Sequence, residues 1–263
     1  MLNIIIGEKL NSSIKSTCEA MTAFNTEHLI KLIKNQAEAG ADYIDVNTAM
    51  CENEFDLMIK IIDLILENTD CGISIDSADA NVISKTADYL YGKNREFILN
   101  SVTLTERADE LIPVAVKYNC KIIAMLIKAY GVLADSESRM EHAGIIINRF
   151  LDSGIKSENI IIDMVVESLL SNYESAAVTC GTLKKFKEKY PDITTLCGIS
   201  NISYGLPNRS ALNAAFLSAV IHDGLDCAIY DVNAPENQAA VYLANLLRGD
   251  DEYCLDYINW TRS

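Results

Sequence analysis

The sequence predicts an α/β protein built as one (β/α)8 TIM barrel domain, and its alternating pattern carries this prediction. Short apolar runs rich in β-branched residues alternate with longer amphipathic segments from one end of the chain to the other. Strands that are apolar on both faces indicate a parallel sheet whose two faces are both buried. The 263 residues contain eight such runs. This gives about 33 residues for each strand and helix unit, which is typical of the barrel.

Each predicted strand is a short run in which apolar and mostly β-branched residues predominate, as expected for a buried strand. The predicted strands are Asn3–Gly7, Tyr43–Asn47, Gly72–Asp76, Phe97–Ser101, Lys121–Leu126, Asn159–Asp163, Thr194–Gly198 and Cys227–Tyr230. A doubly wound open sheet would also alternate strands and helices. However, no GxGxxG or GxxxxGK[ST] motif follows any of these runs, which favours the barrel.

The predicted helices place apolar residues three and four positions apart, so that each has one apolar face. Leu29, Leu32 and Ile33 show this spacing in the first of them. The predicted helices are Thr26–Ala39, Glu54–Glu67, Ala80–Tyr91, Glu106–Lys117, Ser136–Leu151, Tyr173–Lys189, Arg209–Asp223 and Glu236–Arg248. The last residues, 251–263, are rich in large apolar side chains and predict a docked C-terminal tail or part of a subunit contact.

The composition excludes several classes of function. Acidic side chains outnumber basic ones by 37 to 22, and the resulting net charge of −15 repels nucleic acid and anionic lipid. No apolar stretch is long enough to cross a membrane, and the first ten residues lack the basic region of a signal peptide. We therefore expect a cytoplasmic protein without a nucleic-acid or membrane partner.

Cysteine and histidine spacing gives no sign of a bound metal. The eight cysteines are scattered singly without a CxxC pair, and the three histidines form no HExxH motif. We expect the cysteines to be reduced thiols that are mostly buried. Cys197, on the seventh predicted strand, has no histidine in register to activate it, so an unrelated cysteine-dependent barrel enzyme is disfavoured.

Polar residues gather where the predicted strands end, at the end of a barrel that carries the chemistry. Nearly all of them are Asp or Asn, with hardly a Lys, Arg or His among them. Such a mouth suits a neutral heterocycle rich in hydrogen-bond donors, such as the pyrimidinone edge of a pterin, better than a phosphorylated sugar. Helix caps and turns also use Asp and Asn, but four together at one mouth favour a binding site. These four are Asp76, Asn100, Asp163 and Asn201.

Several segments resemble the pterin-binding methyltransferases. The family includes methyltetrahydrofolate:corrinoid/iron–sulfur protein methyltransferase, its demethylase-system relatives and the pterin-binding domain of methionine synthase. The resemblance covers nearly the whole chain, and its most specific part is GISNISYGLPNRSALNAAFL. The matching segments are Gly7–Ser13, Gln36–Asn47, Ile73–Ser77, Ile98–Glu106, Gly198–Leu217 and the tail Asp251–Ile258.

The resemblance implies a homodimeric barrel that binds tetrahydrofolate or methyltetrahydrofolate while a separate corrinoid protein docks over the mouth. It implies that Asn201 lies beside the methyl-bearing ring nitrogen. A tertiary amine releases a methyl group only when it gains a proton or a hydrogen bond, and an amide can donate that bond. The pterin and folate contacts that it implies are Asp76, Asn100, Asp163, Gly198, Ser200 and Arg209. Weaker candidates from the strand ends are Asn11, Asp45 and Asn47.

The chain departs from the family pattern in two rim segments. The segment after the fifth strand reads IKAYG (Ile127–Gly131), where relatives carry an acidic MDDxG-like stretch. The segment after the sixth strand reads MVVESL (Met164–Leu169), where a turn with proline is common. Both departures concern contacts with the folate tail or the corrinoid partner, and they suit a catabolic system that delivers methyl groups to tetrahydrofolate.

Two other functions on the same fold stay open. Dihydropteroate synthase shares the pterin site but has a different set of loops, with an Asn-Thr-Pro-Asp-Ser-Phe stretch after strand one. It also carries Arg and His near strand eight, whereas here strand eight leads into DVNAPEN (Asp231–Asn237). A non-catalytic folate-binding subunit of a corrinoid complex would gain little from Asn201. The sequence itself does not set the direction of methyl transfer.

Overall fold

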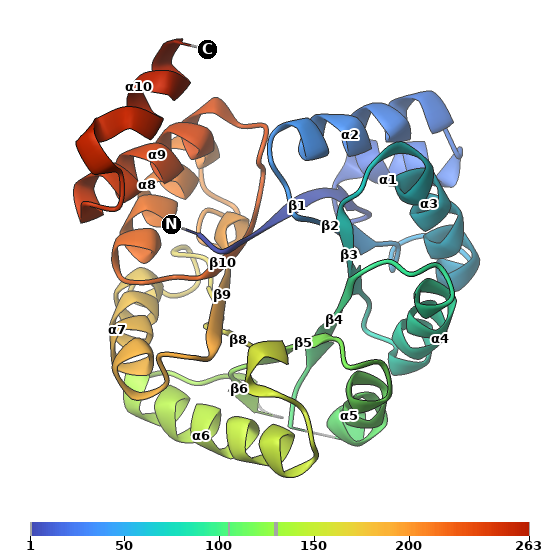
Figure 1. Ribbon diagram of the computed structural model, residues 1–263, viewed down its shortest axis with the longest axis horizontal. Coiled ribbons are helices and arrows are strands. Elements are labelled where there is room, and N and C mark those ends of the chain that lie inside the picture. Colours follow the sequence, from blue (N-terminus) through green and yellow to red (C-terminus); the bar gives the residue numbers. More distant parts are fainter. Residues whose placement is uncertain (1, 105, 129–130, 263) are drawn as a thin grey trace.

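The computed structural model describes residues 2–104, 106–128 and 131–262. Its centre is a closed barrel of eight parallel strands in the order β1-β10-β9-β8-β5-β4-β3-β2, seen end-on in Figure 1. The predicted (β/α)8 fold is thereby confirmed. The barrel strands are β1 (Ile4–Asn11), β2 (Tyr43–Asn47), β3 (Gly72–Asp76), β4 (Phe97–Val102), β5 (Lys121–Met125), β8 (Ile160–Asp163), β9 (Thr194–Gly198) and β10 (Cys227–Tyr230).

The helices form an outer ring around the strands (Figure 1). Helices α1 to α8 lie between successive barrel strands, as the alternation of the sequence predicted, and α9 and α10 follow the last strand. They are α1 (Lys15–Thr22), α2 (Thr26–Glu38), α3 (Glu54–Asn68), α4 (Ala80–Tyr91), α5 (Glu106–Tyr118), α6 (Ser136–Asp152), α7 (Ser175–Lys189), α8 (Arg209–His222), α9 (Pro235–Arg248) and α10 (Leu255–Arg262). Short 3-10 turns cover Ser157–Asn159, Ile199–Asn201 and Glu252–Cys254.

Two apolar layers hold the barrel together. Inside it, side chains from alternate strand positions fill the centre and leave no open channel through this layer; they include Ile6, Ile98, Ile123, Ile161 and Leu196. A larger layer between the strands and the helices contains the opposite faces of the same strands. Because the strands are largely apolar on both faces, most of their polar residues lie near the strand ends, with Asp45 and Ser74 in the middle of β2 and β3 as exceptions.

The first strand is longer than predicted, and the difference shapes the mouth. β1 runs to Asn11, and its register against β2 shifts between Gly7 and Leu10. A Cβ atom on Gly7 would lie 2.4 Å from Oε1 of the buried Gln36, so only glycine fits this close approach. The Gln36 oxygen then accepts a hydrogen bond of 2.9 Å from the Lys9 backbone. The extra residues bring Glu8 and Asn11 to the mouth.

Two further features were not predicted. The short helix α1 follows β1, and a two-stranded hairpin, β6 (Ile127–Lys128) with β7 (Gly131–Val132), follows β5. The hairpin occupies the first departing segment, of which Ala129 and Tyr130 lie outside the described residues. The predicted fifth strand therefore ends one residue early, at Met125.

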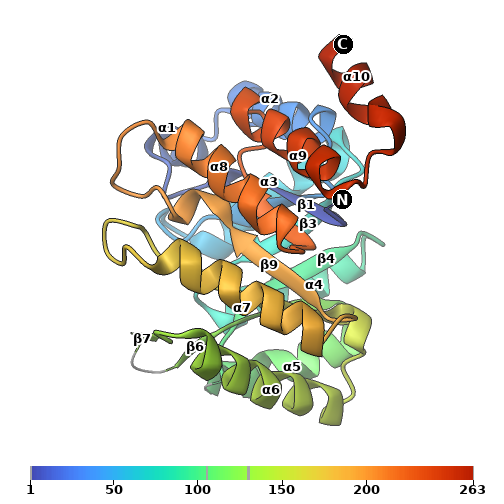
Figure 2. The ribbon, with the colours of Figure 1, turned by 90° about the vertical axis from the view of Figure 1, so that its left-hand side faces the viewer.

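The C-terminal segment leaves the barrel along α9 and extends outward (Figure 2). Trp260 of α10 stacks on Tyr242 of α9 with 4.9 Å between the ring centroids. Ser263, the last residue of the predicted tail, lies outside the described part of the chain. A search of the described helices finds none long and apolar enough to cross a membrane.

Candidate active site

A pocket of about 710 Å³ opens where the barrel strands end. It brings together every site residue that the sequence predicted except Asn47. The predicted residues that line it are Asn11, Asp45, Asp76, Asn100, Asp163, Gly198, Ser200, Asn201 and Arg209. Asn47 lies behind the lining and donates a hydrogen bond of 2.9 Å from Nδ2 to Asp76 Oδ2.

The wall made by β2, β3 and β4 is a connected polar network. Asp45 Oδ1 accepts hydrogen bonds from Ser74 Oγ at 2.6 Å and from Asn100 Nδ2 at 3.0 Å. Parallel pairing places Asn47 beside Asp76 and Asp76 beside Asn100 at the same level of the barrel. This wall is therefore held in place before any ligand arrives.

Burial raises the pKa of all the carboxyl groups of this pocket wall. The pKa of Asp45 lies well above its ordinary value because the group is buried and Asp76 is close. Burial also raises the pKa of Asp76, while the hydrogen bond from Asn47 and the Arg107 cation pull it down. Crowded carboxyls with raised pKa values are typical of functional sites.

Asp163 stands at the end of β8 with a different set of neighbours. Oδ1 accepts a backbone hydrogen bond of 2.9 Å from Val165, and burial raises the pKa of the carboxyl to about 6. No side-chain donor within the described residues hydrogen-bonds to it. The acceptor is thus more open to a ligand than Asp45.

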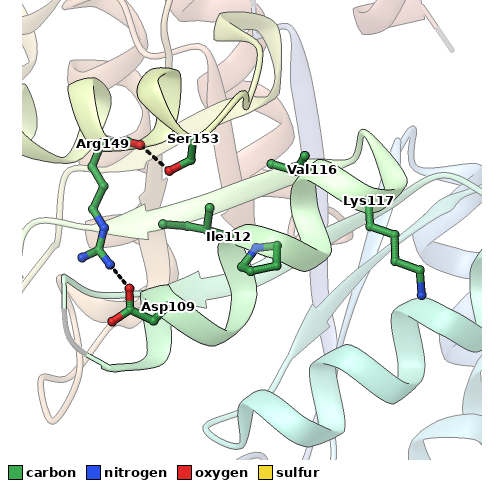
Figure 3. Close-up of a pocket in the computed structure, with 7 residues that line it drawn as sticks. Asp109, Ile112, Val116, Lys117, Arg149 and Ser153 are labelled. Carbon is green, nitrogen blue, oxygen red and sulfur yellow. Dashed lines mark hydrogen bonds and ion pairs between the residues drawn. The ribbon is translucent and has the colours of Figure 1, made fainter.

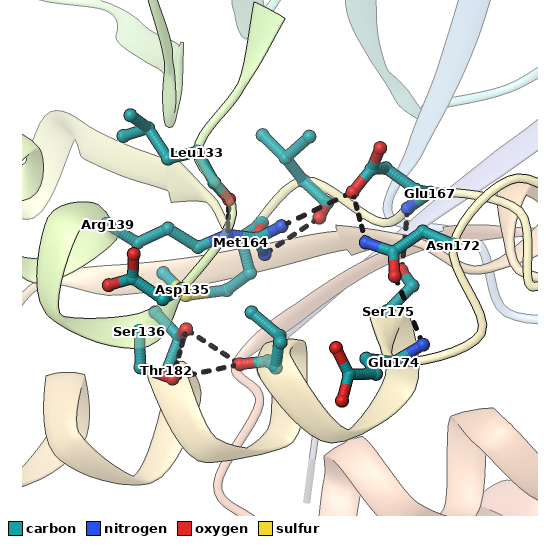
Figure 4. Close-up of polar contacts among 12 residues, drawn as sticks. Leu133, Asp135, Ser136, Arg139, Met164, Glu167, Asn172, Glu174, Ser175 and Thr182 are labelled. Carbon is teal, nitrogen blue, oxygen red and sulfur yellow. Dashed lines mark hydrogen bonds and ion pairs between the residues drawn. The ribbon is translucent and has the colours of Figure 1, made fainter.

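A buried arginine fixes the turn that follows Asp163 (Figure 4). Arg139 is fully buried, and its Nη1 donates to the carbonyl oxygens of Met164 at 2.7 Å and Val165 at 3.0 Å. Its Nε donates to the Leu133 carbonyl at 2.9 Å. Val165 has φ of 54°, which is strained for a β-branched residue. The arginine thus joins the segment after the hairpin to the departing segment Met164–Leu169.

The opposite side of the pocket comes from the turn after β9. Asn201 is exposed to the pocket, and no described residue makes a hydrogen bond to its side-chain amide. A Cβ atom on Gly198 would lie 3.1 Å from Asn201 Nδ2, so glycine leaves that amide its room. Ser200 Oγ donates a hydrogen bond of 2.6 Å to Glu8 Oε1. Burial raises the pKa of Glu8, while the bond from Ser200 lowers it.

Arg209 begins α8 at the rim. Its Nε donates to Ser203 Oγ at 3.0 Å and its Nη2 to the Ser200 carbonyl at 2.8 Å, so it shapes the same turn. Arg209 also belongs to the lining of the pocket. Lys9, the other cation of the lining, is paired with Asp231 at 2.6 Å.

The residues predicted from the sequence did not include three that line the pocket: Glu8, Asn213 and Asn237. These two asparagines line the pocket from the N-terminal parts of α8 and α9, and both are buried. Their Oδ1 atoms have no hydrogen-bond partner among the residues that the structure describes. The signal that could have identified them in the sequence is a polar residue near the start of a helix that follows a strand, at a position on the apolar face of that helix.

Other candidate sites contribute less. A cavity of about 540 Å³ lies between α5 and α6, crossed by an ion pair of Asp109 with Arg149 (Figure 3). None of the polar strand-end residues lines it. Cys197 is fully buried, and burial raises the pKa of its thiol well above the ordinary value. In the described part of the chain, no cluster of three His, Cys, Asp or Glu side chains could hold a metal ion.

Comparison with known proteins places the chain among pterin enzymes. The family described as pterin binding enzyme matches residues 7–231. The chain is 28% identical over 258 residues to a methylcorrinoid:tetrahydrofolate methyltransferase of Eubacterium limosum, covering 97% of this chain and 94% of that protein. It is 26% identical to the methionine synthase of Mycobacterium tuberculosis over 86% of this chain but only 20% of that longer protein.

Solved structures show the same fold. A dihydropteroate synthase from Coxiella burnetii, in complex with pteroic acid, superposes with a TM-score of 0.70 at 18% identity, and the match covers 95% of each chain. The dihydropteroate synthase of Clostridium beijerinckii is 25% identical over 73% of this chain and 74% of that protein.

Proposed function

The chain belongs to the family of pterin-binding enzymes, and on that premise we propose that it moves a methyl group between a reduced folate and a corrinoid carried by another protein. The observation that carries the proposal is the pocket itself, which sets open acceptors on one side against the free Asn201 amide on the other. The alignment with the Eubacterium limosum methyltransferase along nearly the full length of both chains supports it.

The pterin ring would bind along the carboxylate side of the pocket. Asp163 offers a carboxylate with an open lone pair to a ring N–H and its neighbouring exocyclic amine. Asp76 and Asn100 stand side by side on β3 and β4 and would serve the adjacent donor and acceptor positions of the ring. Asp45 would not contact the ring itself. It accepts a hydrogen bond from Asn100 and would thereby orient the Asn100 amide toward the ring.

Asn201 would assist the reaction. Its amide can donate a hydrogen bond to the ring nitrogen in the transition state in which the bond between the methyl carbon and this nitrogen is partly formed, without having to change its own charge. The two directions of transfer share this transition state, so the contact assists both. Gly198 leaves room for this amide, and the bond from Ser200 to Glu8 anchors the preceding residue. The corrinoid cobalt, when its carrier protein is docked, supplies the centre that takes up or gives the methyl group.

The rim of the pocket would receive the rest of the folate and the partner. Arg209 is placed to contact a tail carboxylate, because one of its nitrogens has no bond within the turn. Large exposed side chains on the loops after β2, β8 and β9 would be covered by the corrinoid protein. They are Met50, Leu170, Tyr173 and Tyr204.

The direction and setting of the reaction follow the named relative. Its name places the methyl group on the corrinoid first, so we expect transfer from methylcorrinoid to tetrahydrofolate within a catabolic demethylation system. A homodimer in the cytoplasm, with a corrinoid protein as partner, completes the proposal. No resident metal is part of it.

The test mixes the purified protein with tetrahydrofolate and methylcobalamin under anaerobic conditions and follows the visible spectrum. Loss of the methylated form together with formation of methyltetrahydrofolate is the expected result. If free cobalamin does not react, the same assay is repeated with a methylated corrinoid protein. Absence of tetrahydrofolate binding in calorimetry would overturn the proposal.

Two alternative functions give different results in this assay. A non-catalytic folate-binding subunit would bind tetrahydrofolate without turnover even with a methylated corrinoid protein. A dihydropteroate synthase would instead consume a pterin pyrophosphate and p-aminobenzoate. This second function is disfavoured because Lys9 is already paired and Arg209 is then the remaining cation of the pocket lining.

A further inference from the structure

Two cysteines meet on the segments that follow β1 and β2, at the end of the barrel where the pocket opens. Cys18 lies in α1, and Cys51 lies in the loop between β2 and α3. Their Sγ atoms are 3.8 Å apart, although 33 residues separate them in the sequence. Both side chains are partly exposed, whereas Cys71, Cys120, Cys197 and Cys227 are buried. Four of the eight cysteines are thus buried, and this pair belongs to the four that are not.

The contact is close to what a disulfide requires. A disulfide bond is about 2.05 Å long, so the two sulfur atoms need to approach by about 1.8 Å. The helix α1 and the loop both lie at the surface, where such a shift meets little resistance. The Thr22 hydroxyl also lies 3.8 Å from Cys51 Sγ and can donate to it.

We infer that Cys18 and Cys51 form a modification site that reacts with small disulfide compounds. In this reaction the two cysteines become joined by an intramolecular disulfide. In the first step the Cys18 thiolate attacks the compound R–S–S–R, forming a mixed disulfide and releasing one R–S⁻. In the second step the Cys51 sulfur, after losing its proton to solvent, displaces the other R–S⁻. Two protein thiols are oxidised to one disulfide, and the compound is reduced to two thiols.

The order of attack follows from the surroundings of Cys51. Burial, together with the neighbouring Cys18, raises the pKa of the Cys51 thiol. Cys51 therefore ionises less readily than an ordinary cysteine thiol, and we assign it the second step. Because the second step needs its thiolate, disulfide formation should accelerate as the pH rises above neutrality.

The site connects to the pocket through a short chain of hydrogen bonds. Met50, beside Cys51, donates from its backbone to Ser12 Oγ at 3.0 Å, and Ser12 Oγ donates to Asn47 Oδ1 at 2.9 Å. Asn47 in turn holds Asp76. A disulfide would thus link the first two rim loops next to a pocket residue. The thiol chemistry itself does not depend on the proposed function.

The test treats the reduced full-length protein with 2-hydroxyethyl disulfide, a neutral compound that the acidic chain does not repel. Alkylation and mass spectrometry then count free thiols. We expect the wild type to lose two thiols and about 2 Da without an adduct, with the loss mapped to peptides containing Cys18 and Cys51.

Cys18→Ser and Cys51→Ser should keep the internal disulfide from forming. Each variant should carry an adduct on the remaining thiol. At the same concentration of compound, the fraction of protein modified should be about a tenth or less of the wild-type fraction, because the intramolecular step is lost. Cys254→Ser removes an exposed thiol of the C-terminal segment and should leave the wild-type result unchanged. Circular dichroism confirms that each variant is folded.

Two results would overturn the inference. One is a wild type that carries adducts on both cysteines without an internal disulfide. The other is a wild type whose conversion equals the sum of the two single variants, since that shows two independent thiols.

Discussion

The two ends of the barrel use polar residues in opposite ways. At the end where the strands begin, charged side chains contact neighbouring elements: Lys187 Nζ lies 2.9 Å from Asp226 Oδ2, and Tyr43 donates to Glu96 at 2.7 Å. Asp226 also accepts two hydrogen bonds from Thr195, both of 2.9 Å. These contacts tie strands and helices together.

At the mouth, carboxyl groups instead gather around a cavity. Asp45, Asp76, Asp163 and Glu8 all have a raised pKa because they are buried among few cations. Such crowding costs stability in the free protein. The difference indicates that the first end was selected for folding and the mouth for binding, and matched substitutions at the two ends can test it.

The largest expected effect is on the reaction itself. Asn201→Ala removes the free amide and should slow methyl transfer by about 10- to 1000-fold while weakening folate binding much less. The measurements are single-turnover rates and calorimetric affinity. Asn148→Ala changes an exposed asparagine on α6 and should alter neither quantity. Unchanged transfer in Asn201→Ala would remove this residue from the mechanism.

The second comparison makes one chemical change at both ends. Asp163→Asn should weaken pterin binding by about 1.5–3 kcal/mol, because a charged acceptor is lost from the pocket. Asp226→Asn should leave binding unchanged and lower the free energy of unfolding by about 1–3 kcal/mol, because its three donors lose a carboxylate. Equal effects of the two variants on binding would contradict the division of roles.

The dependence on pH sharpens the same comparison. With the pKa of Asp163 near 6, the ionised group that accepts from pterin N–H donors is lost as the pH falls through that value. Folate affinity should therefore fall by up to about tenfold per pH unit below 6. The stability of the free protein should change in the opposite sense. Native Asp163 binds a proton more readily than it does in the unfolded chain, so its contribution is present below its ordinary pKa and is lost as the pH rises through 6.

Asp163→Asn serves as the control for both curves. The difference between wild type and variant isolates this carboxyl from Asp45, Asp76 and Glu8, whose raised pKa values act in the same direction. Titration of binding by calorimetry and of unfolding by denaturant gives the two curves. Parallel curves for wild type and variant would show that Asp163 does not titrate in this range.

The sequence predicted residues of the pocket lining where a strand end determines their position. Asp76 and Asp163 close apolar runs, and period-two alternation places them at the mouth. Glu8 was not selected, because its position depends on the register shift in β1 and on the close approach of Gln36 to Gly7. The meeting of Cys18 and Cys51 depends on the unpredicted helix α1, whose few residues give a weak periodic signal.

The smallest expected effect comes from a residue that supports the polar network of the β2–β4 wall without contacting the ligand. Ser74→Ala removes the 2.6 Å hydrogen bond that Ser74 Oγ donates to Asp45 and the one that it accepts from Asn100 Nδ2, so these groups lose part of their fixed orientation. Pterin affinity should fall by about 0.5–1.5 kcal/mol, the net value of one such bond. Thr195→Val makes the same hydroxyl deletion at the other end, beside Asp226, and should lower the free energy of unfolding by a similar amount while leaving affinity unchanged. If Ser74→Ala affected only unfolding, the β2–β4 wall would be part of the folding framework, and Asp163 with Asn201 would carry recognition without it.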